Sequence, residues 1–204
     1  WLIAGGGILW IFAAVVFGFI EEQPGSTAGR RSLTDELKQG ARLLQKDKNF
    51  TRFLSVRVLL MAIPLSQPFI VVFAREHLGA GLESLGLFVI ISGISATVSS
   101  PFWGRFADRS SKKLMRFVAL FGVAIIAYVL SFPYWPQTLQ NIYAFSPAFF
   151  LITMAHGGAR LSRKTYLIDY APEEERPLYV AVANTTIGVF TILSGAIGFI
   201  ATAY

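Results

Sequence analysis

The chain has 204 residues, of which 54% are hydrophobic and only 15% are charged, and its formal net charge is +6. This composition excludes an intrinsically disordered chain and disfavours a soluble enzyme domain, because both carry more charge for their hydrophobic content. The sequence contains no Cys and 2 His, so we expect no catalytic thiol, no metal site and no bound cofactor.

The hydrophobic residues fall in six long blocks that carry at most one charge each. The blocks cover residues 1–20, 53–74, 85–103, 114–135, 142–159 and 178–204. A helix needs about 20 apolar residues to cross a hydrocarbon core of roughly 30 Å, and these blocks have about that length. They do not alternate as membrane β-strands do. The sequence therefore predicts an all-α integral membrane protein with six transmembrane helices.

Basic residues gather in every second connection between these blocks. Lys and Arg number seven in 21–52, five in 104–116 and four in 160–177, against one in 75–84 and none in 136–141. Cytoplasmic loops carry such an excess of positive charge, so we expect the three basic connections to be cytoplasmic. The net charge is then a topology signal, and we expect a multi-pass protein that contacts the lipid bilayer and binds no nucleic acid.

The longest connection, residues 21–52, contains a pattern typical of a helix. Ser32 and Asp35 have the spacing of a capping box. Apolar residues follow at helical intervals with basic residues between them: Leu33, Leu37, Ala41 and Leu44. The segment predicts either an amphipathic helix on the cytoplasmic membrane surface or an ordinary solvated linker helix.

The most specific motif lies between the third and fourth blocks, from Gly104 to Leu114, and reads GRFADRSSKKL. It resembles the signature G-x-L-A-D-R-x-G-R-K-x-x-L of the major facilitator superfamily, with Ser111 in place of the second Gly. The resemblance implies that these residues hold a cytoplasmic gate, and we name five of them the gating motif: Gly104, Asp108, Arg109, Lys112 and Lys113. In this interpretation Gly104 allows two helices to approach closely, and Asp108 pairs with a basic side chain or caps a neighbouring helix.

The resemblance also implies a place within a 12-helix fold. The chain begins and ends inside hydrophobic blocks, and residues 1–20 lack the basic start and cleavage site of a signal peptide, so we expect a fragment of a larger protein. Residues 1–20 resemble helix 6, residues 21–52 the cytoplasmic central loop, and residues 53–204 the C-terminal bundle, truncated before its last helix. Pro172 to Arg176 resembles the stretch that precedes helix 11.

A member of this superfamily is a secondary active transporter that moves a small solute across the membrane by alternating access. We expect the bacterial cytoplasmic membrane as its location, and a proton or an ion as a candidate coupling partner. The alternative is a polytopic membrane protein that does not transport, such as a receptor, a scaffold or a membrane-bound enzyme. Because no cluster of His, Asp and Glu lies at membrane depth in the sequence, we expect no enzyme activity.

Four polar residues lie inside the blocks that line the substrate cavity in this superfamily. Gln67 lies between Pro64 and Pro68. We expect its side chain either to contact substrate or to bond to a neighbouring helix. Arg57, about 8 Å inside its block, binds an anionic group or a carboxylate partner, or else snorkels or holds the inner gate. Asn184 bonds to substrate or to another helix, and His156 couples protons or has a structural role.

Overall fold

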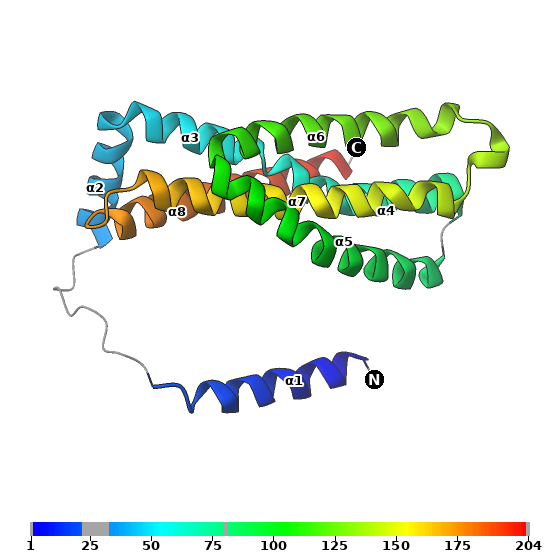
Figure 1. Cartoon of the computed structure of the whole chain (residues 1–204), viewed down its shortest axis with the longest axis horizontal. Helices are drawn as coiled ribbons and strands as arrows, with labels where there is room; N and C mark the ends of the chain where they lie inside the picture. Colours follow the sequence, from blue (N-terminus) through cyan, green and yellow to red (C-terminus); the bar gives the residue numbers. More distant parts are fainter. Residues whose placement is uncertain (1, 22–32, 80, 203–204) are drawn as a thin grey trace. The chain divides into compact units, whose positions relative to one another are not determined.

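The computed structural model of the protein describes residues 2–21, 33–79 and 81–202, and within these ranges helix is the only regular secondary structure (Figure 1). The α-helices are α1 (Leu2–Phe17), α2 (Leu33–Lys46), α3 (Lys48–Leu59), α4 (Ala62–Leu78), α5 (Leu82–Arg109), α6 (Ser111–Ser131), α7 (Ile142–Tyr170) and α8 (Arg176–Thr202). Two short 3-10 helices, Phe132–Tyr134 and Gln137–Leu139, connect α6 to α7. The chain forms two compact units, residues 1–37 and residues 38–204, which are described separately.

Five of the six predicted spans correspond to helices that are long and apolar enough to cross a membrane. In the described part of the chain these spans are Lys48–Leu78, Gly86–Arg109, Ser111–Tyr134, Ile142–Tyr170 and Arg176–Ala196. The sixth predicted span, residues 1–20, contains α1, an apolar helix of 16 residues. At about 1.5 Å a residue, α1 is somewhat shorter than the hydrocarbon core of a bilayer. The prediction of an all-α multi-pass membrane protein is therefore confirmed, with five long spans and one shorter helix.

Helix α7 is the central element of the second unit. It packs against α5, α6 and α4, and α3 packs against α8 (Figure 1). The close approach of α7 to its neighbours depends on Gly158. A Cβ atom at this position would lie 2.8 Å from Val118 Cγ2 on α6 and 2.9 Å from Trp103 Cε2 on α5. The Trp103 indole is fully buried there, and its Nε1 donates a hydrogen bond to the Met154 carbonyl at 2.8 Å.

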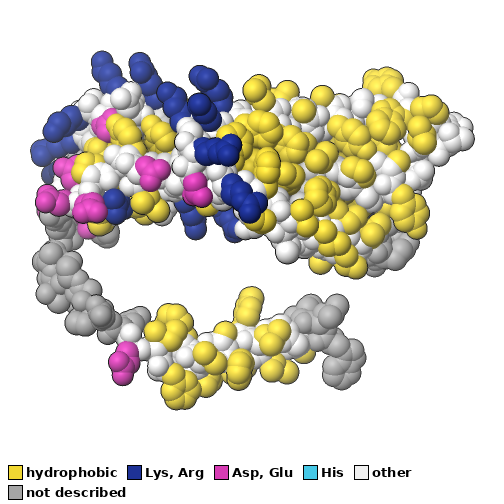
Figure 2. All heavy atoms as spheres, viewed as in Figure 1, with side chains coloured by type: hydrophobic (Ala, Val, Ile, Leu, Met, Phe, Trp, Pro, Cys, Tyr) yellow, Lys and Arg dark blue, Asp and Glu magenta, His cyan; other side chains and the backbone are white. Residues whose placement is uncertain are grey.

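Most of the charged side chains visible on the second unit lie toward one end of it (Figure 2). Figure 2 shows Lys and Arg gathered at that end, while hydrophobic side chains cover most of the rest of the visible face. We call this the basic end; it contains Asp47, the Ser110–Ser111 turn and the connection 171–175. The Ser111 hydroxyl donates to the Asp169 carboxylate at 3.4 Å, so the α5–α6 turn and the end of α7 meet there. The parts of the three basic connections that the structure describes in the second unit therefore share one end of the bundle.

The predicted span 53–74 is divided into α3 and α4 at Leu60 and Met61. The cause is Pro64, because a proline ring clashes with the carbonyl four residues before it and has no N–H to donate. The Leu60 carbonyl accepts instead from the Ile63 amide, at 3.4 Å. Pro68 lies inside α4 and the helix continues through it. The discontinuity therefore lies one turn before the first proline.

Helices α5 and α7 continue well beyond their predicted ends. Helix α5 ends at Arg109, so the first half of the gating motif is helical, and α7 continues to Tyr170 through much of the predicted connection 160–177. The turn after Arg109 needs no left-handed residue, since Ser110 has an extended backbone with φ −173°. Its hydroxyl caps α6 by accepting from the Lys113 amide at 3.3 Å. Ser111 in place of Gly is therefore compatible with this turn.

Helix α2 lies within segment 21–52, and one of its faces is buried against α8. Leu43 is only 8% exposed. A Cβ atom at Gly40 would lie 2.9 Å from Val182 Cγ2, so the helix packs closely on α8. The buried face of α2 thus includes Gly40 and Leu43, which the sequence analysis did not select. The predicted capping residue, Ser32, lies outside the described residues.

Candidate functional site

The structure joins two of the four candidate cavity residues directly. Arg57 on α3 donates through Nη2 to Asn184 Oδ1 on α8, at 2.8 Å. Arg57 is half-buried, whereas Asn184 is exposed in this chain. The bond ties together α3 and α8, which also pack against each other. Asn184 therefore bonds to another helix in the described residues, and its partner is Arg57, which lies within the predicted span 53–74.

Two residues of α7 belong to the same region. His156 and Arg163 are both half-buried, and their separation of seven residues places them on one face of the helix. Arg163 lies near enough to both Arg57 and His156 to interact with them electrostatically. Its Nε donates to the Ala159 carbonyl at 2.9 Å. We call Arg57, His156, Arg163 and Asn184 the polar cluster.

Gln67, the fourth candidate, is not joined to this cluster by any hydrogen bond. It is half-buried on α4, and its amide makes no hydrogen bond with any residue that the structure describes. The neighbouring Ser66 hydroxyl donates to the Ile63 carbonyl at 2.8 Å and so satisfies a backbone group near the prolines. Bonding of Gln67 to a neighbouring helix is therefore not found among the described residues, and its contact with substrate remains a prediction.

The gating motif is mostly exposed at the basic end. Asp108, Arg109, Lys112 and Lys113 are exposed, and Asp108 makes no ion pair or hydrogen bond within the described ranges. Capping of α6 falls to Ser110, so Asp108 does not fill that role. A Cβ atom at Gly104 would meet no atom within 4 Å, so the expected close helix approach is not made by the described part of the chain. The gating role of these residues remains a prediction.

Sequence reasoning missed a group at the basic end that we call the tyrosine anchor: Asp47, Tyr170 and Tyr179. Asp47 accepts from the Phe50 amide at 2.9 Å and so caps α3. It also accepts from the Tyr170 hydroxyl at 2.7 Å and from the Tyr179 hydroxyl at 2.9 Å. Burial raises the pKa of the Asp47 carboxyl, but these hydrogen bonds outweigh burial and hold its pKa below the ordinary value. One carboxylate thus fastens the start of α3 to the end of α7 and the start of α8.

Parts of these groups could have been found in the sequence. Asp47 directly precedes a helical pattern, which is the usual place of a capping residue. Arg163 was assigned to a connection because the hydrophobic block ends at residue 159, although the helix continues to Tyr170.

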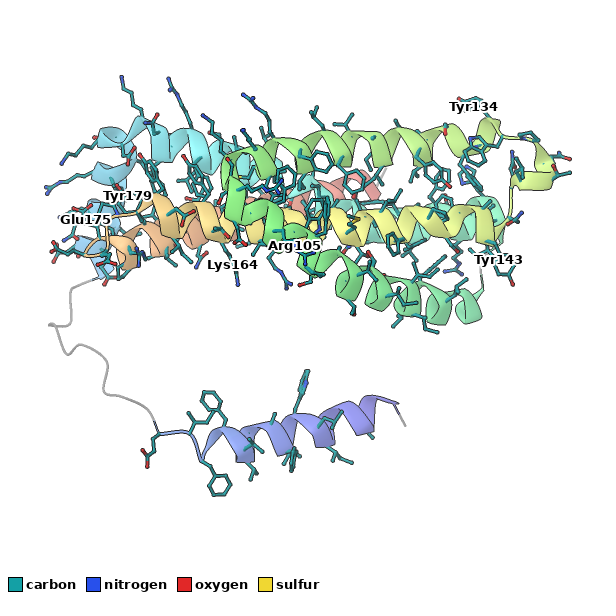
Figure 3. The ribbon with its side chains drawn as sticks, viewed as in Figure 1. Arg105, Tyr134, Tyr143, Lys164, Glu175 and Tyr179 are labelled. Carbon is teal, nitrogen blue, oxygen red and sulfur yellow. The ribbon has the colours of Figure 1, made fainter. Side chains whose placement is uncertain are left out.

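Figure 3 shows Tyr179 and Glu175 at the basic end and Tyr134 and Tyr143 toward the other end of the bundle. Within the described residues, no group of three or more His, Asp or Glu side chains could hold a metal ion.

Long apolar helices, a basic end and a polar cluster within the spans define a multi-pass helical membrane protein with polar groups inside its bundle. The sequence model of the Major Facilitator Superfamily matches residues 1–196. The chain belongs to this superfamily, as the motif around Asp108 predicts.

Several curated proteins are similar to this chain. The Multidrug resistance protein MdtG of Dickeya zeae is 35% identical over 88 residues, which cover 41% of this chain and 20% of that protein. A putative sugar efflux transporter of Deinococcus radiodurans is 33% identical over 76 residues, or 37% of this chain and 20% of that protein. An uncharacterised protein of Mycobacterium tuberculosis, Rv2209, is 27% identical over 204 residues, or 98% of this chain and 39% of that protein.

The chain therefore spans between a fifth and two fifths of the length of these relatives. No solved structure matches it significantly. One of these relatives is named a multidrug resistance protein and another a putative sugar efflux transporter.

Proposed function

We propose that the protein is a secondary active transporter that moves a small solute across the membrane by alternating access. The observation that carries the proposal is the match to the superfamily over residues 1–196. The half-buried polar residues inside the apolar bundle support it. Polar and charged groups are costly at membrane depth, so they generally mark a solute or ion pathway. The names of two relatives, for multidrug resistance and sugar efflux, also favour solute transport.

In this proposal residues 1–20 correspond to helix 6, residues 21–52 to the central loop, and residues 53–204 to the C-terminal bundle. The basic end faces the cytoplasm, in agreement with its excess of Lys and Arg. Because the relatives are bacterial, we place the protein in the bacterial cytoplasmic membrane. The gating motif then closes the cytoplasmic side in one state, with the partner of Asp108 supplied from outside the described residues.

Alternating access requires that one position near the middle of the membrane be reached from each side in turn. Gln67 lies near the middle of the span Lys48–Leu78. The chain has no Cys, so Gln67→Cys adds a single reactive thiol to it. We expect a membrane-impermeant maleimide to label this variant in the full-length protein from both sides of the membrane. Other cysteines of the full-length protein, where present, are replaced first.

Two further positions serve as controls, one on each side of the membrane. They show whether the maleimide leaks across the membrane and whether the assigned topology is correct. Lys112 is exposed at the basic end and Tyr134 is 90% exposed beyond α6. We expect Lys112→Cys to be labelled only from the cytoplasmic side and Tyr134→Cys only from the other side. Labelling of Gln67→Cys from one side alone, in every condition tested, would contradict alternating access at this position. Labelling of both controls from the same side would contradict the topology.

A further inference from the structure

The polar cluster collects positive charge without a compensating acid. Arg57 and Arg163 interact repulsively, and both lie inside candidate spans. Arg160, at the exposed edge of α7, adds a further positive charge near His156. Among the described residues, no Asp or Glu forms an ion pair with any of these side chains. A charge in a low-dielectric region is stabilised mainly by an opposite charge, so this arrangement lacks its counter-ion.

The cluster also contains buried polar atoms without partners. Arg57 uses Nη2 for Asn184, but its Nε is buried and has no hydrogen-bond partner in the described part of the protein. The same is true of His156 Nδ1. A guanidinium carries five N–H donors, and a buried polar group without a partner costs about 1–3 kcal/mol. The cluster is therefore incomplete as it stands, and it offers donors to an acceptor from outside these residues.

The helical hydrogen-bond pattern is irregular beside the cluster. The irregular turn between α3 and α4, at Leu60 and Met61, begins three residues after Arg57. Both residues keep right-handed helical angles, so Lys48–Leu78 continues as one distorted helix. Proline frees backbone carbonyls in a spanning helix, and such groups are tolerated where the helix lines a cavity. The irregular turn and the missing counter-ion are independent observations, one from the backbone and one from the side chains, and both point to the same place.

We propose, on the basis of the transport function proposed above, that the transported solute is an anion with carboxylate or phosphoryl oxygens and that Arg57 binds it. The planar fork of Arg matches the two oxygens of such a group, which gives charge-assisted hydrogen bonds. Arg163 and His156 add positive potential and a further polar atom at the site. Asn184 is a positioning residue, since its hydrogen bond fixes the orientation of the Arg57 guanidinium. A cationic solute would be repelled here.

The test compares solutes that differ mainly in charge, with the full-length protein purified in detergent at fixed ionic strength. The anionic probes are benzoate, citrate, methylphosphonate and glucose 6-phosphate. The matched neutral and cationic probes are benzyl alcohol, glucose and benzylamine. A solute that binds the native state raises the apparent Tm in proportion to its saturation, so titration gives an apparent Kd. We expect at least one anion to stabilise the protein, and its uncharged or cationic counterpart to have no effect.

The variants then assign the effect to Arg57. We expect Arg57→Gln to weaken the apparent Kd of that anion about tenfold or more, equivalent to at least about 1.4 kcal/mol. Arg57→Lys keeps the charge and should retain the preference for anions. Lys164→Gln makes the same charge change at an exposed position of α7 and should leave binding unchanged (Figure 3). The apparent Tm without solute shows whether each variant is folded.

Three outcomes overturn the inference. The first is stabilisation by glucose, benzyl alcohol or benzylamine in preference to the anions. The second is no stabilisation by any anion together with a lower unliganded Tm in Arg57→Gln, which would indicate a carboxylate of the same protein as the counter-ion. The third is anion binding that Arg57→Gln leaves unchanged. The cysteine test at Gln67 needs no ligand, so failure of the anion inference can be distinguished from failure of the transport proposal.

Discussion

Arg57 and Asn184 lie 127 positions apart in the chain, and their side chains are joined by a hydrogen bond of 2.8 Å between Nη2 and Oδ1. The pair connects the first and last long spans of the second unit. Because one partner is charged, the bond is stronger than a bond between two neutral groups. A change at either residue therefore affects both the packing of α3 on α8 and the charge available at the polar cluster.

Asn184→Asp tests the electrostatic role of this pair. The new carboxylate would replace the amide oxygen that accepts from Arg57, and it would neutralise the positive charge of Arg57 that we propose to bind the anionic solute. We expect the apparent Kd for a stabilising anion to weaken roughly tenfold or more, while the unliganded Tm is maintained by the new ion pair. The measurement is the thermal-shift titration with benzoate, citrate, methylphosphonate and glucose 6-phosphate.

Asn184→Ala is the matched control for that prediction, because it removes the acceptor without adding charge. We expect it to weaken anion binding less than Asn184→Asp does. Lys164→Glu makes a larger charge change at an exposed position and should have little effect. If Asn184→Ala and Asn184→Asp weakened anion binding equally, the orientation of the Arg57 guanidinium, and not the added charge, would control binding.

The tyrosine anchor predicts a loss of stability when Asp47 is removed. Asp47→Ala deletes a helix cap and leaves the Tyr170 and Tyr179 hydroxyls without their acceptor. These two effects together cost roughly 2–4 kcal/mol. Asp47→Asn keeps an oxygen that can cap α3 and accept from tyrosine, so it should cost less. The measurement is the apparent Tm of the detergent-purified protein.

Phenylalanine variants provide the matched controls for the anchor. Tyr179 is only 5% exposed, whereas Tyr134 is 90% exposed and has no hydrogen-bond partner among the described residues. We expect Tyr179→Phe to lower stability by about 1 kcal/mol and Tyr134→Phe to have no effect. If the two substitutions lowered the Tm equally, the anchor would not be a source of stability.

The lowered pKa of Asp47 makes the same anchor sensitive to acid. A carboxyl whose pKa is lower in the folded protein stabilises the fold above its unfolded pKa, near 4, and this stability is lost as the pH falls through the folded pKa. We therefore expect the apparent Tm difference between wild type and Asp47→Asn to be constant from pH 7 to about pH 5 and to shrink below about pH 4. If this Tm difference grew toward low pH, the result would contradict a lowered pKa of Asp47 in the folded protein.

The sequence predicted the helices well because long apolar blocks leave few alternatives in a membrane. It also identified Arg57, Asn184 and His156 as unusual, since polar groups at membrane depth are rare. It could not pair Arg57 with Asn184, or Asp47 with Tyr170 at a separation of 123 residues, because tertiary packing decides such contacts. Arg163 was missed for a different reason. Hydropathy marks where a helix leaves the apolar region, and α7 continues beyond that point.

Glycine substitutions test the packing of α7 in the structure. Gly158→Ala would place a Cβ atom 2.8 Å from Val118 and 2.9 Å from Trp103, so the neighbouring side chains must move. Such overpacking costs about 1–3 kcal/mol. At Gly157 the nearest atom, Trp103 Cδ1, is 3.7 Å away, so Gly157→Ala makes only ordinary contacts. We expect Gly158→Ala to lower the apparent Tm clearly and Gly157→Ala to leave it unchanged or raise it slightly.

The gating proposal makes a prediction that separates function from stability. Asp108 is exposed and is not part of the packed core of the described residues, so Asp108→Asn should leave expression of the folded protein largely unchanged. If Asp108 stabilises the state closed on the cytoplasmic side, its loss should shift the population toward the state open on that side. Labelling of Gln67→Cys from the cytoplasm should then rise relative to labelling from the other side, by roughly tenfold for a typical coupling energy.

Glu173→Gln is the matched control for Asp108→Asn, because it removes an exposed acid from the connection between α7 and α8. It should leave the ratio of labelling from the two sides unchanged. An unchanged ratio in Asp108→Asn would remove Asp108 from the gate and leave the match to the superfamily signature without a mechanical role.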